Sequence, residues 1–314
     1  MAQGFYEFKS KGIFVFLINE FLLNKKVDVI GVGPPKTATT WIADVLRDHP
    51  QVYVPKEKEL HYFNPVQHYH RDVVNRNSTQ PESWYHDFFE NAPSEVIWAE
   101  FTVSYFEFPE CAERIFKYNS KAKIIISLRE PVARAFSHYL FLKNKGVIGP
   151  ESFEDYVEQD SYVFDVSMYA ENLKKYLEVF PKDQILVLLH EDLRLNAQNF
   201  YDRIIQFLGA DATVDIDLNR VSNAATKVKS HKLNSMYMGL REWIHKKKLY
   251  RVLDVSQALG LTKFLEWIRD EVNMAPSDKA PKMSADLKRK YGQLFEEDRL
   301  ELQRLLNRDL SEWD

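Results

Sequence analysis

Short hydrophobic runs alternate along the chain with segments in which apolar residues recur at helical spacing. Four runs predict buried strands, because nearly every residue in them is apolar and many are β-branched; they cover residues 27–32, 96–99, 123–128 and 184–189. Helical spacing predicts helices between and after these runs, at residues 39–47, 132–142, 173–179 and 197–208. Hydrophobic strands separated by helices predict an α/β fold in which helices flank a central parallel sheet.

We assign residues 27–314 to a single domain built on this sheet and residues 1–26 to an N-terminal helical segment. The apolar stretch at residues 12–23 is shorter than the roughly 20 apolar residues that a membrane-spanning helix needs. It predicts an amphipathic helix that packs on the domain and no transmembrane anchor; contact with a membrane surface stays open. Residues 284–306 predict one further amphipathic helix, and the side chains expected to face inward are Leu287, Tyr291, Leu294, Phe295, Leu302 and Leu305.

Composition and charge exclude some function classes. The formal net charge of -4 over 314 residues gives no electrostatic reason to expect a nucleic-acid partner. Cys111 is the single cysteine of the sequence, so neither a disulfide within the chain nor a multi-cysteine zinc site can form. A reducing compartment fits this cysteine content, and we expect a cytoplasmic protein without a metal centre.

The first candidate site directly follows the first predicted strand, at residues 31–41 (GVGPPKTATTW). A strand, a tight turn and a helix start bring backbone N–H groups and the positive end of a helix dipole together, which favours phosphate. Lys36 adds a positive charge that a capped turn alone does not explain. Hydroxyl donors come from three threonines, Thr37, Thr39 and Thr40. The loop differs from the triphosphate motif GxxxxGK[ST], because Pro35 precedes the lysine where that motif has glycine.

A second candidate site follows the third predicted strand, at the edge where doubly wound sheets bind ligands. Arg129 comes directly after that strand, and Ser137 lies on the helix that follows. Taken alone, these residues are equally consistent with an ordinary surface ion pair and a surface serine. Together with the Lys36 loop they predict a second phosphate contact, and two separated contacts suit a nucleotide with phosphates at two places.

These segments resemble a known family, the sulfotransferases that use 3'-phosphoadenosine 5'-phosphosulfate (PAPS). Residues 35–41 (PKTATTW) resemble the family's phosphosulfate loop PKSGTTW, and residues 124–139 (IIISLREPVARAFSHY) resemble its 3'-phosphate element. Residues 56–63 (KEKELHYF) are similar to the heparan-sulfate-type and bacterial branch. Residues 223–233 look like the family's late basic loop, and the tail at 281–313 is again similar. The resemblance implies the sulfotransferase fold, which is P-loop-like.

The resemblance also implies a role for individual residues around PAPS. The 5'-phosphosulfate would be held by Pro35, Lys36, Thr37, Ala38, Thr39, Thr40 and Trp41. For Trp41 the resemblance implies stacking on adenine; the alternative is an ordinary aromatic residue packed in the core. Arg129 and Ser137 would bind the 3'-phosphate, with Lys227 or Lys229 closing over it.

An alcohol is a poor nucleophile at neutral pH, so the reaction needs a base. Two candidates lie close together, Glu59 and His61, and the resemblance favours Glu59 as base with His61 orienting the substrate. Lys36 would stabilise the charge that develops on the leaving phosphate. A structural ion pair between Glu59 and Lys56 or Lys58 is the competing interpretation.

The expected activity is transfer of the sulfuryl group from PAPS to a hydroxyl, giving a sulfate ester and 3'-phosphoadenosine 5'-phosphate (PAP). The acceptor stays open between a glycan, a glycolipid, a small alcohol and a hydroxyacyl group bound to a carrier protein. Phe101 stands where the heparan-sulfate branch usually has a lysine that approaches its acceptor. Two alternatives are an ATP-dependent small-molecule kinase that uses the same loop and a nucleotide-sensing protein that has lost the base.

Overall fold

The structure is a computed structural model of the chain. It describes the following residues: 25–67, 73–149, 151–219, 226–230, 236–237, 239–240, 243–244, 247, 249, 255–256, 259–267, 273–276, 281 and 283–313. The predicted N-terminal helix at residues 12–23 lies outside these residues, so it stays a prediction. In the described part of the chain, no helix has the length and apolar character needed to cross a membrane.

The residues group into two compact units, each described here by itself. The first, which we call the sheet unit, comprises Met1–Leu128 and Glu171–Arg220. The second, which we call the helical unit, comprises Arg129–Ala170 and Val221–Asp314.

The sheet unit contains a five-stranded sheet in the order β2-β3-β1-β4-β5, and every neighbouring pair is parallel. The strands are β1 (Val29–Gly33), β2 (Val52–Tyr53), β3 (Ile97–Phe101), β4 (Lys123–Leu128) and β5 (Ile185–Leu189). All strands therefore end at the same edge, and β1 lies in the centre, where the strand order changes direction. Ligands of open parallel sheets bind at this position, beside the carboxyl ends of the strands.

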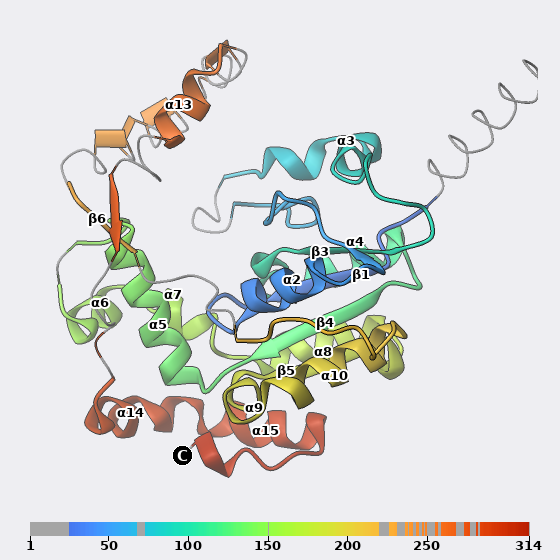
Figure 1. The fold of residues 1–314 in the computed structure, drawn as a ribbon. Helices are drawn as coiled ribbons and strands as arrows, with labels where there is room; N and C mark the ends of the chain where they lie inside the picture. The colour runs from blue at the N-terminus through green and yellow to red at the C-terminus, as the bar shows by residue number, and fades with distance from the viewer. Residues whose placement is uncertain are drawn as a thin grey trace, which may run out of the picture. The chain divides into compact units, whose positions relative to one another are not determined.

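Helices connect and cover the strands of the sheet unit (Figure 1). They are α2 (Thr39–Arg47), α3 (Glu82–Asp87), α4 (Glu110–Tyr118), α8 (Ala170–Val179), α9 (His190–Leu195) and α10 (Ala197–Leu208), with short 3-10 helices η1 (Arg76–Thr79), η2 (Val103–Glu107) and η3 (Lys182–Gln184). On one face of the sheet, α2 and α10 form a core with the strands; Ile42 of α2 and Ile204 of α10 are fully buried in it. Side chains alternate along a strand, so Glu100 of β3, which lies between the core residues Ala99 and Phe101, faces the opposite side.

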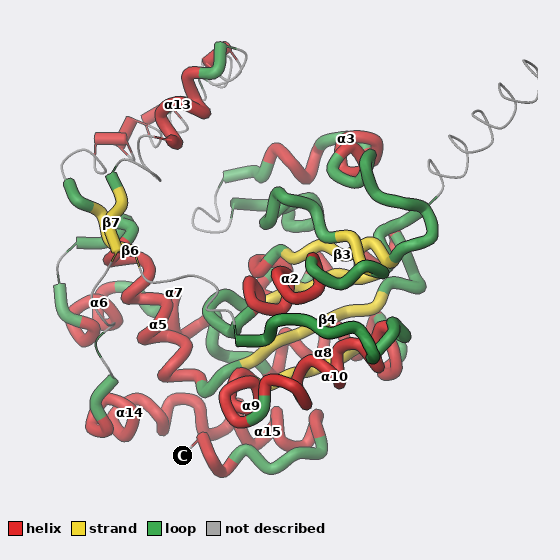
Figure 2. Tube along the Cα trace, in the orientation of Figure 1, coloured by secondary structure: helices red, strands yellow, loops and turns green. Residues whose placement is uncertain are grey.

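The helical unit packs α5 (Pro131–Asn144), α6 (Phe153–Gln159) and α7 (Tyr162–Asp165) against the C-terminal helices through buried aromatic residues such as Phe153 and Tyr291. Its remaining elements are β6 (Thr226–Val228), α13 (Leu261–Trp267), β7 (Met274–Pro276), α14 (Ala285–Gly292), η5 (Gln293–Phe295), α15 (Glu296–Leu306) and η6 (Ser311–Trp313). Strands β6 and β7 pair antiparallel as a small ribbon, visible in Figure 2.

The predicted fold class is confirmed, because the strands form a parallel sheet flanked by helices. The prediction of one continuous helix over residues 284–306 is wrong. A 3-10 segment, η5, separates α14 from α15, and within it Leu294 is 55% exposed while Phe295 is buried. Strand β2 was not predicted, since two residues carry no usable hydrophobic period. The proposed boundary between an N-terminal segment and the domain stays a prediction.

Candidate functional site

The loop after β1 is held close to the end of the neighbouring strand. Gly33, the last residue of β1, has a φ of 101°, which favours glycine. A Cβ atom built on Gly33 would lie 2.2 Å from the backbone oxygen of Val103. Only glycine therefore permits this approach between the loop and the segment that follows β3.

The backbone of the loop has the conformation of an anion site. Lys36 and Ala38 both have positive φ, at 74° and 73°, as do residues of the nest-like concavities that bind anions. Ala38 is the N-cap of α2 and makes no side-chain capping hydrogen bond, and the first turn of this helix contains no acidic residue. Among the described residues, no side chain therefore caps this helix end, whose N–H groups and dipole favour a negative charge.

Two hydroxyl groups that point inward hold the loop in place. Thr37 is fully buried, and its hydroxyl donates a 2.7 Å hydrogen bond to the carbonyl oxygen of Pro34. The hydroxyl of Ser127, on β4, donates to the carbonyl oxygen of Thr37. In the structure the Thr37 hydroxyl therefore stabilises the loop, and the predicted role of Thr37 in ligand binding, through its hydroxyl or its backbone N–H, stays a prediction.

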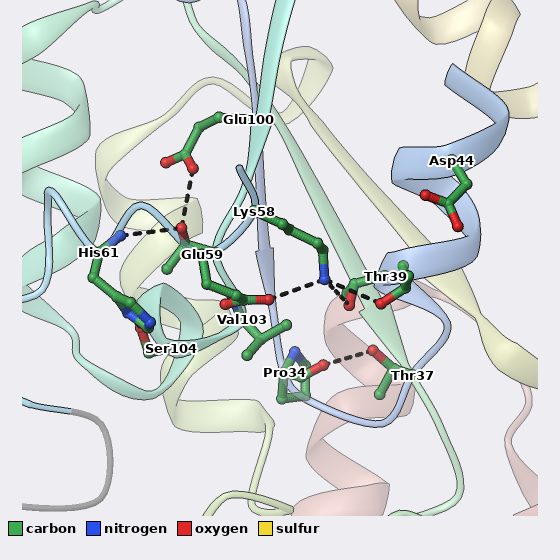
Figure 3. Close-up of polar contacts among 12 residues, drawn as sticks. Pro34, Thr37, Thr39, Asp44, Lys58, Glu59, His61, Glu100, Val103 and Ser104 are labelled. Atoms are coloured by element: carbon green, nitrogen blue, oxygen red, sulfur yellow. Dashed lines mark hydrogen bonds and ion pairs between the residues drawn. The ribbon is translucent and has the colours of Figure 1, made fainter. Parts of the chain in front are cut away.

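Lys58 is a site residue that the sequence interpretation placed only in a competing ion pair. Its Nζ atom lies 2.9 Å from Oε1 of Glu59, 3.2 Å from Oγ1 of Thr40 and 3.4 Å from Oγ1 of Thr39 (Figure 3). The ion pair with Glu59 is therefore present, but it lies at the start of α2, next to the predicted phosphate loop. Lys56, the other predicted partner, is exposed. The sequence shows that Lys58 is a charged residue next to Glu59. It does not show that the Lys58 side chain contacts the two threonines.

Glu59 lies beside the end of β3. Its backbone N–H donates a 3.1 Å hydrogen bond to the carbonyl oxygen of Phe101, and its φ is 64°. One carboxylate oxygen, Oε2, accepts the backbone N–H of Val103 at 2.8 Å, and the other, Oε1, accepts from Lys58. Each oxygen keeps a second lone pair for a substrate proton. The carboxylate is thus oriented by two donors, and the Glu59 side chain is still 29% exposed.

His61 also has a positive φ, of 52°, and several hydrogen bonds fix it. Its Nδ1 lies 3.0 Å from the hydroxyl of Ser104, which constrains the ring. Its backbone N–H donates to the Thr102 hydroxyl at 3.4 Å, and its carbonyl oxygen accepts from Asn75. Residues in such uncommon conformations cluster at functional sites when the surrounding contacts hold them.

Glu100, on β3, is a buried carboxyl group that the sequence interpretation did not include. Its Oε2 atom accepts a 3.0 Å hydrogen bond from Thr102, and the hydroxyls of Tyr85 and Tyr105 lie beside the carboxyl group. Burial raises the pKa of Glu100 to about 8, and the negative charge of Glu59 acts in the same direction, against the hydroxyls of Tyr105 and Thr102. At neutral pH, Glu100 is therefore mostly protonated and uncharged.

Trp41 belongs to the core. Its side chain is 7% exposed, and its ring meets that of Phe200 edge to face, with the centroids 5.8 Å apart. The structure thus shows Trp41 as a packed aromatic residue, and its stacking on adenine stays a prediction. Helical spacing places Trp41 near the start of α2 without showing which way its ring turns, so both interpretations were open from the sequence.

Arg129 and Ser137 both lie in the helical unit and are partly exposed. The carbonyl oxygen of Arg129 accepts a 2.8 Å hydrogen bond from the hydroxyl of Tyr169. On the same helix as Ser137, Arg134 is fully buried; its Nε donates to Ser167 at 2.7 Å and Nη1 lies 3.2 Å from Nδ1 of His138. Arg134 and His138 are thus packing residues, and the contact of Arg129 and Ser137 with a 3'-phosphate stays a prediction.

The two lysines of the expected late loop lie at a short strand. Lys227 is on this strand, and Lys229 follows it. Lys227 lies on β6, opposite Ala275 of β7. Lys229 follows β6 and is exposed, and its backbone N–H donates a 2.7 Å hydrogen bond to the carbonyl oxygen of Asn273. The rest of the predicted basic loop, residues 223–225 and 231–233, lies outside the described residues.

The donor set of the sheet unit fits an anion of the phosphosulfate type. At the carboxyl edge of the sheet it combines an uncapped helix start, the hydroxyls of Thr39 and Thr40, and the ammonium group of Lys58, with Lys36 in the loop. An oriented carboxylate, Glu59, lies directly beside these groups. The fold and site together define an α/β protein whose strand–loop–helix unit is suited to bind an anion, with an oriented carboxylate beside it.

A sequence model of the sulfotransferase domain family matches residues 26–263, and the chain belongs to this family. The resemblance noted from the loop motifs is therefore confirmed. The chain is 28% identical over 180 residues to heparan sulfate glucosamine 3-O-sulfotransferase 5 from Homo sapiens, a match that covers 53% of this chain and 49% of that protein.

Other relatives agree with this assignment. The chain is 30% identical over 159 residues to the membrane-associated sulfotransferase kil1 from Dictyostelium discoideum, covering 48% of this chain and 31% of that protein. It thus spans about half or less of the length of these relatives. A crystal structure of a sulfotransferase from Alicyclobacillus acidocaldarius has the same fold, with a TM-score of 0.65 at 22% identity, covering 92% of this chain and 99% of that one.

Proposed function

We propose that this protein transfers the sulfuryl group of PAPS to a hydroxyl group of an acceptor. The observation that carries the proposal is the ion pair of 2.9 Å between Lys58 and Glu59, which joins a candidate base to the start of the phosphate loop helix. Membership of the sulfotransferase family supports this activity over the kinase alternative. The absence of a glycine before Lys36 also argues against the triphosphate motif.

PAPS supplies an activated sulfuryl group on its 5'-phosphate. In the proposed reaction, the acceptor oxygen forms a bond to sulfur, and the bond between sulfur and the 5'-phosphate oxygen breaks with its electron pair on that oxygen. Glu59 takes the proton of the acceptor hydroxyl, and the products are a sulfate ester and PAP. Lys36 and the N–H groups at the start of α2 stabilise the charge that the phosphate gains. The work of the protein is thus alignment and charge stabilisation.

The structure supplies a reason to expect a less acidic acceptor than heparan sulfate, on which the names of several relatives say that they act. Phe101 stands where the heparan-sulfate branch usually carries a lysine. Its ring is 2% exposed and packs against Gly31, where an added Cβ atom would lie 2.0 Å away. Position 101 therefore contributes core packing and no positive charge for a sulfated glycan. We propose a weakly charged or neutral hydroxyl acceptor, such as an unsulfated glycan, a glycolipid, a small alcohol or a carrier-bound hydroxyacyl group.

The purified chain tests the activity directly. It is incubated with PAPS, and separately with ATP and magnesium, together with a panel of sulfated and unsulfated glycans, glycolipids, small alcohols and hydroxyacyl carriers. Mass spectrometry then looks for a gain of one sulfate or one phosphate. A sulfate ester supports the proposal, and a phosphate ester overturns it. Binding of PAP without turnover on any acceptor indicates the nucleotide-sensing alternative.

We also propose that the protein acts in a reducing, cytoplasmic compartment. Cys111 is a free thiol and is buried, and burial raises its pKa well above the ordinary value. A buried, protonated thiol needs no oxidising environment. Fractionation of cells that express the tagged chain tests this location.

A further inference from the structure

The ammonium group of Lys58 lies between the start of the phosphate loop helix and the candidate base. It has three hydrogens, and the structure gives it three acceptors: the hydroxyls of Thr39 and Thr40 and one oxygen of Glu59 (Figure 3). The two threonines are the first residues of α2. A single side chain therefore contacts both groups of the proposed active site.

This position is electrostatically unusual. The start of a helix carries partial positive charge, which attracts anions and disfavours a lysine. Here α2 has no acidic residue in its first turn, and within the described residues Lys58 forms its ion pair with Glu59. Lys36 lies in the loop that precedes the same helix, so two lysines belong to this part of the sheet unit. An anionic ligand at the helix start would be attracted both by the helix dipole and by the ammonium group of Lys58.

We propose that Lys58 is a second cationic contact for the 5' end of the sulfuryl donor and that it links this contact to the orientation of Glu59. The inference rests on the proposed function and adds a residue to it. In the proposed complex, Lys58 keeps its ion pair with Glu59 and turns the hydrogens now directed at Thr39 and Thr40 toward the donor anion. The Lys58 side chain is 20% exposed and ends beside the first residues of α2, so its ammonium group can reach a ligand there without a movement of the backbone. Occupation of the donor site would then hold the base in place.

Binding measurements on stable nucleotides test the contact without relying on activity. Calorimetry compares PAP, which has a 5'-phosphate, with adenosine 3'-phosphate, which lacks one. We expect Lys58→Met to weaken the binding of PAP by roughly 10-fold or more, because it removes a charged hydrogen bond. Its affinity for adenosine 3'-phosphate should stay as in the wild type. Lys58→Arg keeps the charge and should restore most of the affinity for PAP.

The matched control is Lys56→Met, which removes the same charge from an exposed position two residues earlier. It should leave both affinities unchanged. An equal loss for both nucleotides in Lys58→Met would show a merely structural role, and unchanged binding of PAP would overturn the proposal as well. Thermal unfolding of each variant shows whether it is folded. If Lys58→Met is not folded, the affinity of Lys58→Arg for the two nucleotides decides the question. If the wild-type protein itself does not bind PAP, the proposed function fails, whatever the variants do.

Discussion

The hydroxyl of Thr102 joins the buried carboxyl group of Glu100 to the backbone of His61. It donates a 3.0 Å hydrogen bond to Oε2 of Glu100, and its oxygen accepts the N–H of His61 at 3.4 Å. The conformation of the segment that carries both candidate acid–base residues thus depends on a carboxyl group 1% exposed. This arrangement makes the protonation state of Glu100 part of the stability of the site.

Replacement of Glu100 by glutamine should remove a pH dependence of stability. Burial raises the pKa of Glu100 from 4.5 to about 8 in the folded chain. Between these values the folded state holds a proton that the unfolded state has lost, so the free energy of unfolding falls as the pH rises, by up to about 1.4 kcal/mol per pH unit. The decline should begin near the unfolded pKa and end above the folded one.

Urea unfolding of the wild type and of Glu100→Gln at several pH values between 5 and 9 measures this effect. The free energy of unfolding should depend less on pH in the variant than in the wild type. When both curves are set equal at pH 9, the wild type should gain more stability than the variant as the pH is lowered. Glu57→Gln, which changes an exposed carboxyl group, should follow the wild type. Parallel curves for wild type and Glu100→Gln would contradict the raised pKa.

Glu59→Gln should abolish sulfuryl transfer while leaving the binding of PAP nearly intact. An amide cannot take the acceptor proton, and loss of a general base typically lowers the rate by roughly 100- to 10,000-fold. Single-turnover kinetics and calorimetry measure the two properties separately. The assignment of the base would be wrong if this variant turned over normally while His61→Ala did not.

Lys36→Ala should lower kcat/KM by an amount that corresponds to about 2–4 kcal/mol, as expected for one preorganised charged donor at a developing negative charge. Steady-state kinetics with PAPS and an accepted substrate give this value. Lys56→Ala, which removes an exposed lysine, serves as the control and should stay within about 2-fold of the wild type. An effect on the binding of PAP alone, with the chemical step unchanged, would contradict the proposed role of Lys36.

Gly33→Ala should destabilise the fold and disturb the site together. The new Cβ atom would collide with the backbone oxygen of Val103, 2.2 Å away, at a φ of 101°. We expect a loss of at least about 2 kcal/mol in the free energy of unfolding. The N–H of Val103 binds Glu59, so the remaining folded protein should also lose activity.

Gly209→Ala provides the comparison, because Gly209 has a similar positive φ, of 75°, but no atom within 4 Å of the built Cβ. It should cost only about 1 kcal/mol, from backbone strain. Chemical denaturation of both variants separates the steric contribution from the conformational one. Equal losses would show that the contact with Val103 is not the reason for glycine at position 33.

Local sequence patterns were sufficient to predict strands of the sheet and helices that pack on it. The predicted bounds of α2, β4 and α10 coincide with those observed, because hydrophobic period and capping are properties of neighbouring residues. The same patterns failed at residues 284–306, where the 3-10 segment η5 interrupts a continuous apolar spacing. They also left the direction of the Trp41 ring undecided, since a helix end faces both ligand and core.

The amino-acid sequence by itself determined the parallel α/β architecture, the loop around Lys36 and the pair of acid–base candidates, because each is encoded by residues close together in the chain. Only the tertiary structure decided that Lys58 contacts Thr39 and Thr40, and that the buried Glu100 is linked to His61 through Thr102. These contacts join segments that the folding of the sheet brings together. The electrostatic effect of Lys58 and the raised pKa of Glu100 depend on distance and burial, and a local pattern of residue types shows neither.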